Sequence, residues 1–278
     1  MDCTELNKKM KNVLRNTGDM ALKRRAKNII EGLELKNGDK ILDVGCGDGY
    51  YLHLLSNLGL NLKLVGTDDD ELGLKKAKTN LNKNIKLVQA DLMKNLPFKH
   101  SLFDKIVMSE VAEHLLNDLK GLREVNRVLK PGGILVLTVP NHNYPFLWDP
   151  INWLLENLLG KHVKSGFFAG IWNQHERLYA PKQIRKVVEK AGFRVSAVES
   201  LTFWCLPFNH YIVNLVARLL AHGNLSEKSR SSLSKYTKDP KRSLLLDIAF
   251  GFVNMLDKLN DFWQPKDRGV SVFVKAVK

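Results

Sequence analysis

The sequence predicts an α/β fold with a mostly parallel sheet and helices on both of its faces. Between residues 40 and 139, short apolar runs of strand length alternate with longer segments of helical periodicity. Turns that contain glycine separate several of these runs. Parallel strands need a crossover between them, so this alternation is typical of repeated strand–helix–strand units.

The expected elements follow in chain order. Two helices are expected over residues 5–33, with a break near 16–19, and a turn at 36–39 leads into the first strand. A turn at 131–133 precedes the fifth strand. The strands are expected at 40–44, 62–67, 85–89, 103–108, 134–139, 193–198 and 269–277, and the helices between them at 50–58, 72–81, 109–129 and 181–191.

Segments outside this alternation predict a helical and aromatic cap. Residues 141–176 hold three tryptophans among prolines and glycines, which we interpret as an insertion that covers the binding edge of the sheet. Residues 203–221 and 243–263 are strongly apolar, but polar and charged residues interrupt both, so neither predicts a membrane-spanning helix. The polar, basic stretch between them predicts a mobile loop. The predicted organisation is N-terminal helices at 1–35, a binding core at 36–140, a covering insertion at 141–176, a return to the core at 177–200, an apolar helical cap with a basic loop at 201–265, and a last core strand at 266–278.

The charge of the chain is strongly positive and unevenly distributed. The net charge is +14, and residues 161–243 hold fifteen basic and five acidic residues, a net of +10. An acidic partner would suit this charge: RNA, an anionic membrane surface or a negatively charged substrate. A solvated lysine-rich surface explains it equally simply.

Cysteine usage and the N-terminus predict the compartment. Cys3, Cys46 and Cys205 are widely spaced and indicate neither a disulfide framework nor a zinc site. The first residues are polar and lack the apolar stretch of a signal peptide. We therefore expect a cytoplasmic protein, with peripheral membrane contact as an option.

The strongest motif is a glycine-rich turn that follows the first buried strand, from Asp43 to Gly49. Glycine has no Cβ, so Gly45, Gly47 and Gly49 allow tight turning and close approach of a ligand to the backbone. Open parallel sheets bind ligands at the carboxyl ends of their strands, where this turn lies. The spacing is G-x-G-x-G with Tyr50 next, which departs from the dinucleotide fingerprint G-x-G-x-x-G.

Acidic residues follow the second and third strands. Asp68 can accept hydrogen bonds from both hydroxyls of a ribose, and Asp91 can accept from an adenine amino group. Asp69 and Asp70 compete with Asp68, although aspartate at this position commonly caps the following helix.

Together these residues resemble the class I S-adenosylmethionine-dependent methyltransferases. The resemblance covers residues 35–140 closely and resumes at 175–193. It implies a Rossmann-like, seven-stranded sheet whose last strand runs antiparallel. It also implies that Asp43 and the glycine turn face the methionine end of the cofactor, Asp68 the ribose and Asp91 the adenine. The cofactor residues that we expect are Asp43, Gly45, Cys46, Gly47, Gly49, Asp68, Asp69, Asp91, Leu92 and Ser109.

A cluster of ionisable residues follows the fourth strand, beside the expected methyl group. On a helix, Glu110, Glu113 and His114 would share one face. Two carboxylates and one imidazole can hold a divalent ion, and these ligands suit magnesium or manganese better than zinc. The E-x-x-E-H pattern is similar to those of the quinone-biosynthesis O-methyltransferases and the small-RNA terminal 2′-O-methyltransferases.

The same cluster also has a metal-free interpretation. Many class I methyltransferases carry a Glu-His pair here without a metal, and the histidine then packs near the donor or acts as a base. His142 and His175 lie after later elements and are further candidates, although each is also typical of a surface or packing histidine. We expect His114, Glu110 and His175 to be the catalytic residues.

The leading hypothesis is therefore methyl transfer to a small, hydrophobic or lipid-like acceptor, with oxygen favoured over carbon and nitrogen. The apolar stretches favour such an acceptor, either as a lid or at a membrane surface, although ordinary core packing is an equal explanation. The alternative is an RNA methyltransferase, with metal-assisted 2′-O-methylation as one form. The charge and the E-x-x-E-H pattern favour it, but the sequence contains no recognised RNA-binding module. A binding protein without catalysis is a third class, against which the intact glycine turn and both acids argue.

Overall fold

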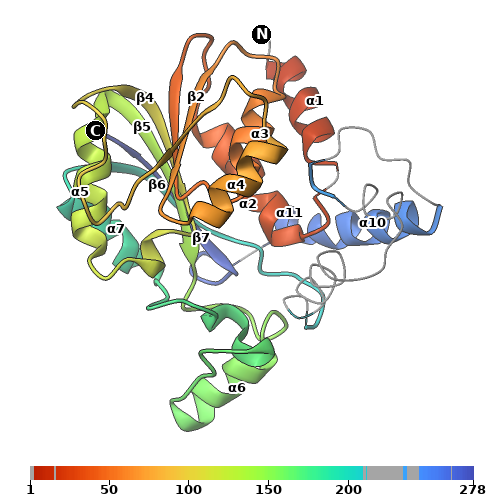
Figure 1. The fold of residues 1–278 in the computed structure, drawn as a ribbon. Coiled ribbons are helices and arrows are strands. Elements are labelled where there is room, and N and C mark those ends of the chain that lie inside the picture. Colours follow the sequence, from red (N-terminus) through yellow and green to blue (C-terminus); the bar gives the residue numbers. More distant parts are fainter. Residues whose placement is uncertain (1–2, 16, 209–210, 212–233, 237–243, 264) are drawn as a thin grey trace.

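The computed structural model describes residues 3–15, 17–208, 211, 234–236, 244–263 and 265–278 (Figure 1). Seven strands form one sheet in the order β3-β2-β1-β4-β5-β7-β6. Every neighbouring pair is parallel except the two pairs that β7 makes with β5 and β6. This confirms the predicted Rossmann-like, mostly parallel sheet with an antiparallel last strand. The strands are β1 Lys40–Val44, β2 Lys63–Asp68, β3 Lys86–Gln89, β4 Phe103–Ser109, β5 Leu129–Pro140, β6 Arg194–Leu201 and β7 Ser271–Val277.

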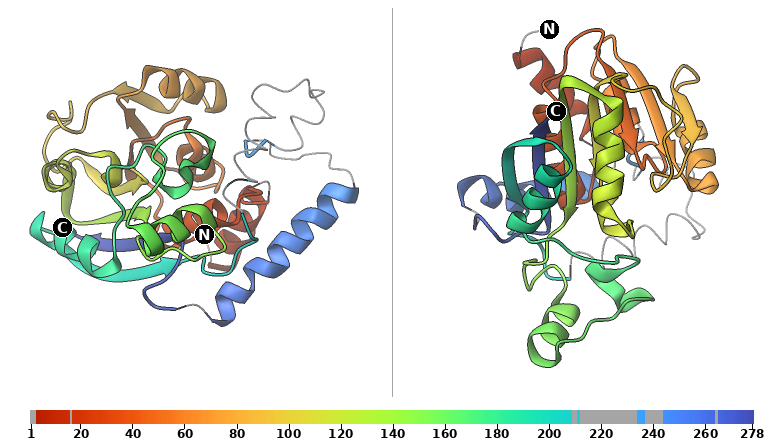
Figure 2. Two further views of the ribbon diagram at one scale, coloured as in Figure 1. Left: turned by 90° about the horizontal axis from the view of Figure 1, so that it is seen from below. Right: turned by 90° about the vertical axis from the view of Figure 1, so that its left-hand side faces the viewer.

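Helices cover both faces of the sheet (Figures 1 and 2). Side chains alternate between the faces of a strand, so Ile41 packs into the core under one set of helices and Leu42 into the core under the other. The first set is α1 Cys3–Val13, α2 Met20–Gly32, α3 Tyr50–Ser56 and α4 Glu71–Asn80; the second is α5 Asp118–Val128 and α7 Pro181–Lys190.

Aspartate side chains fix where two of these helices begin. Asp19 accepts hydrogen bonds from the backbone nitrogens of Ala21 and Leu22 at the start of α2. Asp70 accepts from Leu72 and Gly73 at the start of α4, so it is a helix cap, as its position predicts. The caps define the entry of both helices next to the carboxyl edge of the sheet.

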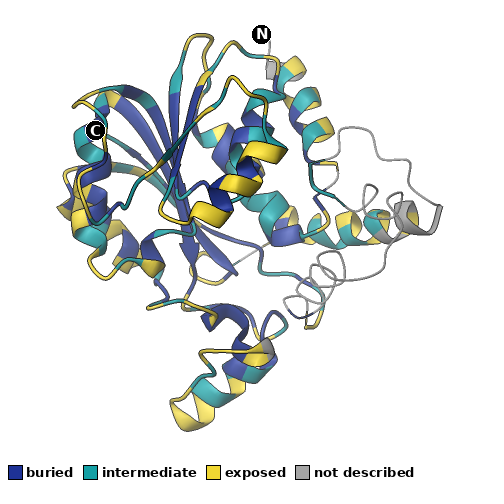
Figure 3. Ribbon diagram, viewed as in Figure 1, coloured by how far each residue is buried: buried dark blue, intermediate teal, exposed yellow. Residues whose placement is uncertain are grey.

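Further helices lie beyond the sheet. Within the predicted insertion, α6 Pro150–Leu159 and the 3₁₀ segment η2 Phe167–Trp172 extend from one end of the sheet (Figure 1; Figure 2, right). They surround a third apolar cluster that includes Trp148 and Trp172. On another side, α10 Leu244–Asp257 and α11 Leu259–Phe262 lie against α2. Both outlying parts carry exposed surface, whereas the sheet is buried (Figure 3).

One predicted element is wrong. The expected helix from 109 to 129 is split into a 3₁₀ turn, η1 Ala112–His114, and α5, because Leu115 has an extended backbone and Asn117 caps the start of α5. The expected turn at 131–133 falls within β5, where Gly132 has φ of 73° and the register with β4 jumps from Leu129 to Ile134.

The predicted apolar cap is described only in part. Most of the stretch 203–221 and most of the basic loop after it lie outside the described residues. Within the part of the chain that the structure describes, no helix combines the length and apolar character needed to cross a membrane.

Candidate active site

A cavity of about 430 Å³ opens at the carboxyl ends of β1, β2 and β4 and beside the residues that follow β3, the edge that the sequence predicts. Of the ten predicted cofactor residues, five line this cavity. The other five lie within the glycine turn or behind the cavity wall. The lining residues among the ten are Gly45, Asp68, Asp69, Asp91 and Leu92.

The glycine turn has the backbone that only glycine adopts easily. Gly45, Gly47 and Gly49 have φ of 69°, 50° and 85°. A Cβ on Gly45 would lie 2.4 Å from Val111, and one on Gly49 would lie 2.7 Å from Leu81. A Cβ on Gly47 would meet nothing within 4 Å, so this glycine borders open space. Gly45 and Gly49 are thus needed for close packing, whereas Gly47 leaves room beside the turn.

Asp68 links the end of β2 to this turn. Its carboxylate accepts hydrogen bonds from the backbone nitrogens of Gly47 at 2.7 Å and Asp70 at 2.9 Å. Burial raises the pKa of Asp68 above its ordinary value. Each carboxylate oxygen can accept a second bond, so Asp68 is oriented toward the cavity and keeps acceptor capacity for a hydroxyl pair.

The far end of the cavity has apolar walls and one carboxylate. Asp91 accepts from the backbone nitrogen of Met93 at 2.8 Å, which fixes its side chain. Ala90, Leu92 and Leu96 line the same end. A flat apolar ring with one exocyclic donor group matches such surroundings.

Asp43 lies behind the turn and is almost fully buried, with 1% of its surface exposed. Neither of its carboxylate oxygens has a hydrogen-bond partner among the described residues. Burial, with a contribution from Asp68 and Asp48, raises the pKa of Asp43 well above its ordinary value. A buried carboxyl without a partner is costly and indicates a position that serves a ligand or the turn itself.

An arginine that the sequence analysis missed reaches this edge from α2. Arg25 Nη1 lies 2.6 Å from Glu110 Oε2, and its Nε is buried without a partner among the described residues. Burial alone would lower the pKa of Arg25, but Glu110, with smaller contributions from Tyr51, Asp19 and Glu113, outweighs it and the net pKa is raised, so the guanidinium stays charged. Arg25 lies four residues before the buried Ile29, one helical turn away on the same face, and this spacing was the available signal.

A chain of hydroxyl groups continues the polar edge. Tyr51 on α3 and Thr138 on β5 each make a 2.8 Å hydrogen bond with Ser109 Oγ. Burial raises the pKa of Tyr51 to about 12, so its hydroxyl keeps its proton at neutral pH. Ser109, a predicted cofactor residue, is therefore held within this chain.

Three ionisable side chains meet beside the cavity: Glu113, His114 and His175. Their candidate ligand atoms all lie within 4.8 Å of one another. Each histidine Nε2 is 3.9 Å from Glu113 Oε1. Glu113 is fully buried, and neither of its carboxylate oxygens has a hydrogen-bond partner among the described residues. Burial, and then the nearby Glu110, raise its pKa well above the ordinary range.

Hydrogen bonds to carbonyl oxygens fix the tautomers of the two histidines. His114 Nδ1 lies 2.9 Å from the carbonyl oxygen of Gln174, and His175 Nδ1 lies 2.5 Å from that of Ile171. A carbonyl only accepts, so each Nδ1 carries the proton and each neutral ring keeps its lone pair on Nε2. In this tautomer Nε2 is the ring atom that can accept a proton or bind a metal ion.

Other predicted residues have different places. Glu110 does not join this group of three, because its left-handed backbone turns it to Arg25; the predicted shared helical face is wrong. His142 donates its backbone nitrogen to Tyr179 and is exposed. Cys46 is buried, and burial raises the pKa of its thiol.

Part of the predicted mobile loop contacts the glycine turn. Lys235 Nζ lies 3.0 Å from an Asp48 carboxylate oxygen and 4.8 Å from the centre of the Tyr50 ring. Tyr236 donates its hydroxyl to the carbonyl oxygen of Asp48 at 3.1 Å. These contacts connect residues far apart in sequence, and the local polar composition gave no signal for them.

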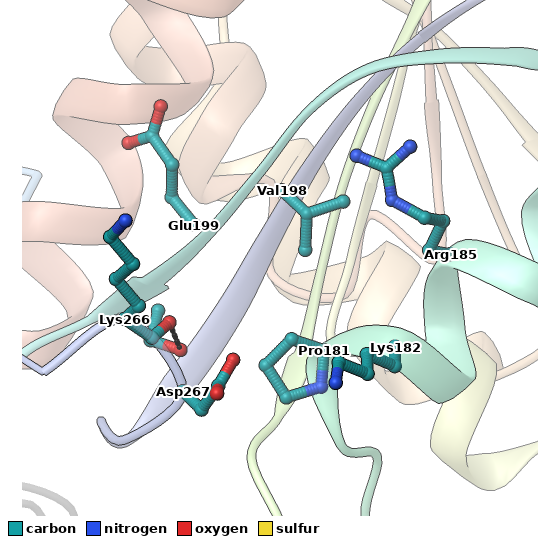
Figure 4. Close-up of a pocket in the computed structure, with 8 residues that line it drawn as sticks. Pro181, Lys182, Arg185, Val198, Glu199, Lys266 and Asp267 are labelled. Carbon is teal, nitrogen blue, oxygen red and sulfur yellow. Dashed lines mark hydrogen bonds between the residues drawn. The ribbon is translucent and has the colours of Figure 1, made fainter.

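A second cavity, of about 460 Å³, lies between α7 and the end of β6 (Figure 4). Lys182, Arg185 and Lys266 line it together with Glu199 and Asp267. These charges are exposed and of both signs, and they do not converge on one point in the close-up. The ligand-binding features concentrate in the first cavity.

Comparison with known proteins agrees with this geometry. A family model described as a methyltransferase domain matches residues 42–137. A demethylmenaquinone methyltransferase of Staphylococcus aureus is 30% identical over 189 residues, which cover 63% of this chain and 76% of that protein. The chain belongs to the class I S-adenosylmethionine-dependent methyltransferases.

Two further similarities concern the sequence and the fold. An uncharacterised protein of Methanocaldococcus jannaschii is 35% identical over 176 residues, which cover 58% of this chain and 64% of that protein, slightly less than two thirds of its length. A solved methyltransferase structure from Archaeoglobus fulgidus matches with a TM-score of 0.52 at 19% identity, over 91% of each chain. At that identity the match shows the fold alone.

S-adenosylmethionine is the cofactor of these methyltransferases, and the cavity is chemically compatible with it. Its hydroxyl and amino donors would face the carboxylates of Asp68 and Asp91. Gly47 leaves space beside the turn, and Asp43 and Arg25 have unused hydrogen-bonding groups at the opposite end.

Proposed function

We propose that this chain transfers a methyl group from S-adenosylmethionine to a small, hydrophobic acceptor of the quinol type, with a ring oxygen as the favoured methylated atom. The observation that carries the proposal is the group of Glu113, His114 and His175, whose His114 lines the cavity. Leu115 and Leu116 line the mouth of the same cavity, and Leu116 is 81% exposed. An apolar mouth next to a proton acceptor suits a phenolic ring. The name of the S. aureus relative, a demethylmenaquinone methyltransferase, supports an acceptor of this class.

The proposed binding roles follow from charge and hydrogen-bonding capacity. Asp68 accepts from the two ribose hydroxyls, and Asp91 accepts from the adenine amino group. The Nε of Arg25 donates to the carboxylate of the methionine part, since this nitrogen is buried without a partner among the described residues. The guanidinium of Arg25 offers a carboxylate both a positive charge and a hydrogen-bond donor.

When bound, the cofactor supplies a methyl group on a positively charged sulfur. The acceptor oxygen forms a bond to the methyl carbon, the carbon–sulfur bond breaks, and its electron pair stays on the sulfur as a neutral thioether. The acceptor proton goes to Nε2 of His114 or His175. The positive charge of the sulfonium would therefore end on this imidazole, and the residues around the site would bring the reacting atoms into line.

A bound metal ion is the second form of this proposal. The set Glu113, His114 and His175 offers one carboxylate and two imidazoles, whereas the sequence predicted two carboxylates and one imidazole. More nitrogen ligands favour manganese, iron or zinc over magnesium. Such an ion would lower the pKa of an acceptor hydroxyl.

Metal binding can be tested without activity by titrating Mn²⁺ into chelator-treated protein and following its electron paramagnetic resonance signal. We expect wild type and Glu110→Gln to bind and Glu113→Gln not to bind. If Glu110→Gln loses the ion while Glu113→Gln keeps it, the three-residue assignment is wrong. If wild type binds none, His114 and His175 act as bases only.

Activity is tested by incubating the protein with labelled donor and either a short-chain demethylated quinol or total RNA. We expect label in the quinol, lost in His114→Ala/His175→Ala while donor binding measured by calorimetry persists. Label in RNA alone would reject the proposed acceptor class.

A further inference from the structure

Helix α10 is apolar on the face that points away from the protein. A surface helix usually directs its apolar stripe inward and its polar residues to solvent. Here the continuous run of α10 and α11 also carries large apolar side chains on the side that faces solvent. A spacing of i, i+4, i+7, i+11 and i+14 keeps five of them on one side of a helix, and the sixth follows directly where α11 ends. This outer stripe consists of Ile248, Phe252, Met255, Leu259, Phe262 and Trp263, which are 44–86% exposed.

The inner face of α10 is fixed to α2 by polar contacts. Lys23 donates to Asn254 at 2.6 Å, and Arg24 pairs with Asp257 at 2.9 Å and with Asp261 at 2.8 Å. Because these contacts define which side faces the protein, the outer stripe lies on the far side from α2. Arg24 thus pairs with two acids of the α10–α11 run.

Basic residues flank the outer stripe. Lys258 lies within the run, and Lys266 and Arg268 follow it; all three are exposed. Asp267 is the one acid between Lys266 and Arg268, so this segment keeps a net positive charge. In sequence, residues 227–242 before α10 hold six basic and two acidic residues. The sequence on both sides of the stripe is therefore net positive.

Aromatic rings lie at the end of the stripe. Trp263 contacts Phe203 at 5.7 Å and Trp204 at 6.0 Å between ring centres. Tryptophan and phenylalanine beside basic groups are typical of helices that lie in the interface of a bilayer, with rings in the acyl boundary and cations at the headgroups.

We propose that the outer stripe docks on the surface of an anionic lipid bilayer. Apolar side chains enter the acyl boundary and the flanking lysines and arginines bind the negative headgroups. A second copy of this chain would bring together two surfaces of like charge, so charge favours lipid over self-association. An exposed apolar stripe of this size indicates an interaction site rather than ordinary surface.

The docking surface and the active site share α2. Arg24 holds α10, and the adjacent Arg25 reaches Glu110 at the cavity. A bound bilayer would thus be separated from the active site by α2 alone, and it could supply a hydrophobic acceptor. That the bilayer supplies the acceptor rests on the proposed function, whereas lipid binding itself does not.

Vesicle flotation of the full chain tests the proposal, with phosphatidylcholine alone and phosphatidylcholine mixed with phosphatidylglycerol. We expect binding to the mixed vesicles at low salt, reduced about tenfold or more in the variant Phe252→Ser/Met255→Ser/Phe262→Ser. The control is Leu72→Ser, which removes a leucine that is 65% exposed on α4 and should bind like wild type. Calorimetry with S-adenosylhomocysteine checks that every variant is folded, because a folded variant should bind this product like wild type.

Three results would overturn the proposal: no binding of wild type to the mixed vesicles, equal binding by the triple variant, or a wild-type dimer that the triple variant converts to a monomer in sedimentation. The third result would make a second copy the occupant. Transfer to a short-chain acceptor in solution separates the two proposals, because the triple variant should keep it. Vesicle binding without any transfer would reject the proposed function alone.

Discussion

Arg25 on α2 and Glu110 after β4 form an ion pair of 2.6 Å that connects the N-terminal helices to the reacting edge of the sheet. The two side chains are 15% and 25% exposed. Each would leave a poorly solvated charge behind if the other were removed. This pair therefore controls both the stability of the edge and the charge that a bound cofactor would meet.

Arg25→Met should destabilise the protein by roughly 3 kcal/mol, the lower end of what breaking a buried pair costs, because Glu110 is left without its partner. The double variant Arg25→Met/Glu110→Gln should recover most of this loss. Urea unfolding measures both. If the double variant is as unstable as the sum of the single ones, the two residues are not energetically coupled.

Asp68→Ala should weaken donor binding by about 1.5–3 kcal/mol, the usual scale for hydrogen bonds to a charged group. Calorimetry with S-adenosylhomocysteine measures the affinity. Asp70→Asn is the matched control, since asparagine also caps a helix and the substitution should leave affinity unchanged. Unchanged affinity in Asp68→Ala would remove Asp68 from the ribose role.

Gly47→Ala and Gly38→Ala form a second matched pair. Both glycines have positive φ, 50° and 90°, and a Cβ on either would meet nothing within 4 Å. Each substitution should cost about 1–2 kcal/mol of stability through backbone strain. Only Gly47→Ala should also lose donor affinity, because its Cβ enters the space beside the turn. Equal affinity in both variants would contradict the place we give Gly47.

The pH dependence of stability should reveal Asp43. Burial raises its pKa in the folded protein, so above the ordinary carboxyl range the folded state holds a proton that the unfolded chain has released. Wild type should therefore lose stability as pH rises through this window, by up to about 1.4 kcal/mol per pH unit. Asp43→Asn cannot titrate at this position and should show a smaller slope, because Glu113 and Asp68, whose pKa values are also raised, still contribute.

Asp104 should change the pH dependence of stability in the opposite direction to Asp43. Burial acts to raise its pKa, but Lys130 and the backbone nitrogen of Lys40 outweigh it, and the net pKa is lowered. Its stabilisation is present above the ordinary carboxyl range and is lost as pH falls, so Asp104→Asn should change the acid side only. If wild type and Asp43→Asn show equal slopes in urea unfolding, the buried carboxyl is ionised.

The sequence was sufficient for features that depend on local pattern. Alternating strands and helices, the glycine turn and the acids after β2 all follow from short-range periodicity and spacing. The number of strands and the antiparallel last strand followed from the family resemblance.

Features that depend on tertiary approach were only partly predictable. His175 was an expected site residue, but its approach to Glu113 across sixty-two residues of chain was not predicted. The approach of Lys235 to Asp48, across a much longer separation, was not predicted either. Glu110 has a left-handed backbone instead of a helical one. No residue next to it in the sequence predicts this conformation. The direction of its side chain, and hence its exclusion from the group of three, followed from that one dihedral angle.

The position of β7 between β5 and β6 has a consequence for biosynthesis. All strands that bear cofactor residues leave the ribosome early, yet β6 has no neighbour until β7 follows it out, after residue 271. Until then β6 and the free side of β5 expose unpaired backbone groups, which nascent chains shield poorly. We expect the nucleotide-binding half to compact during translation and the other half to close only once β7 has emerged, which makes this interval the time when chaperones are most needed.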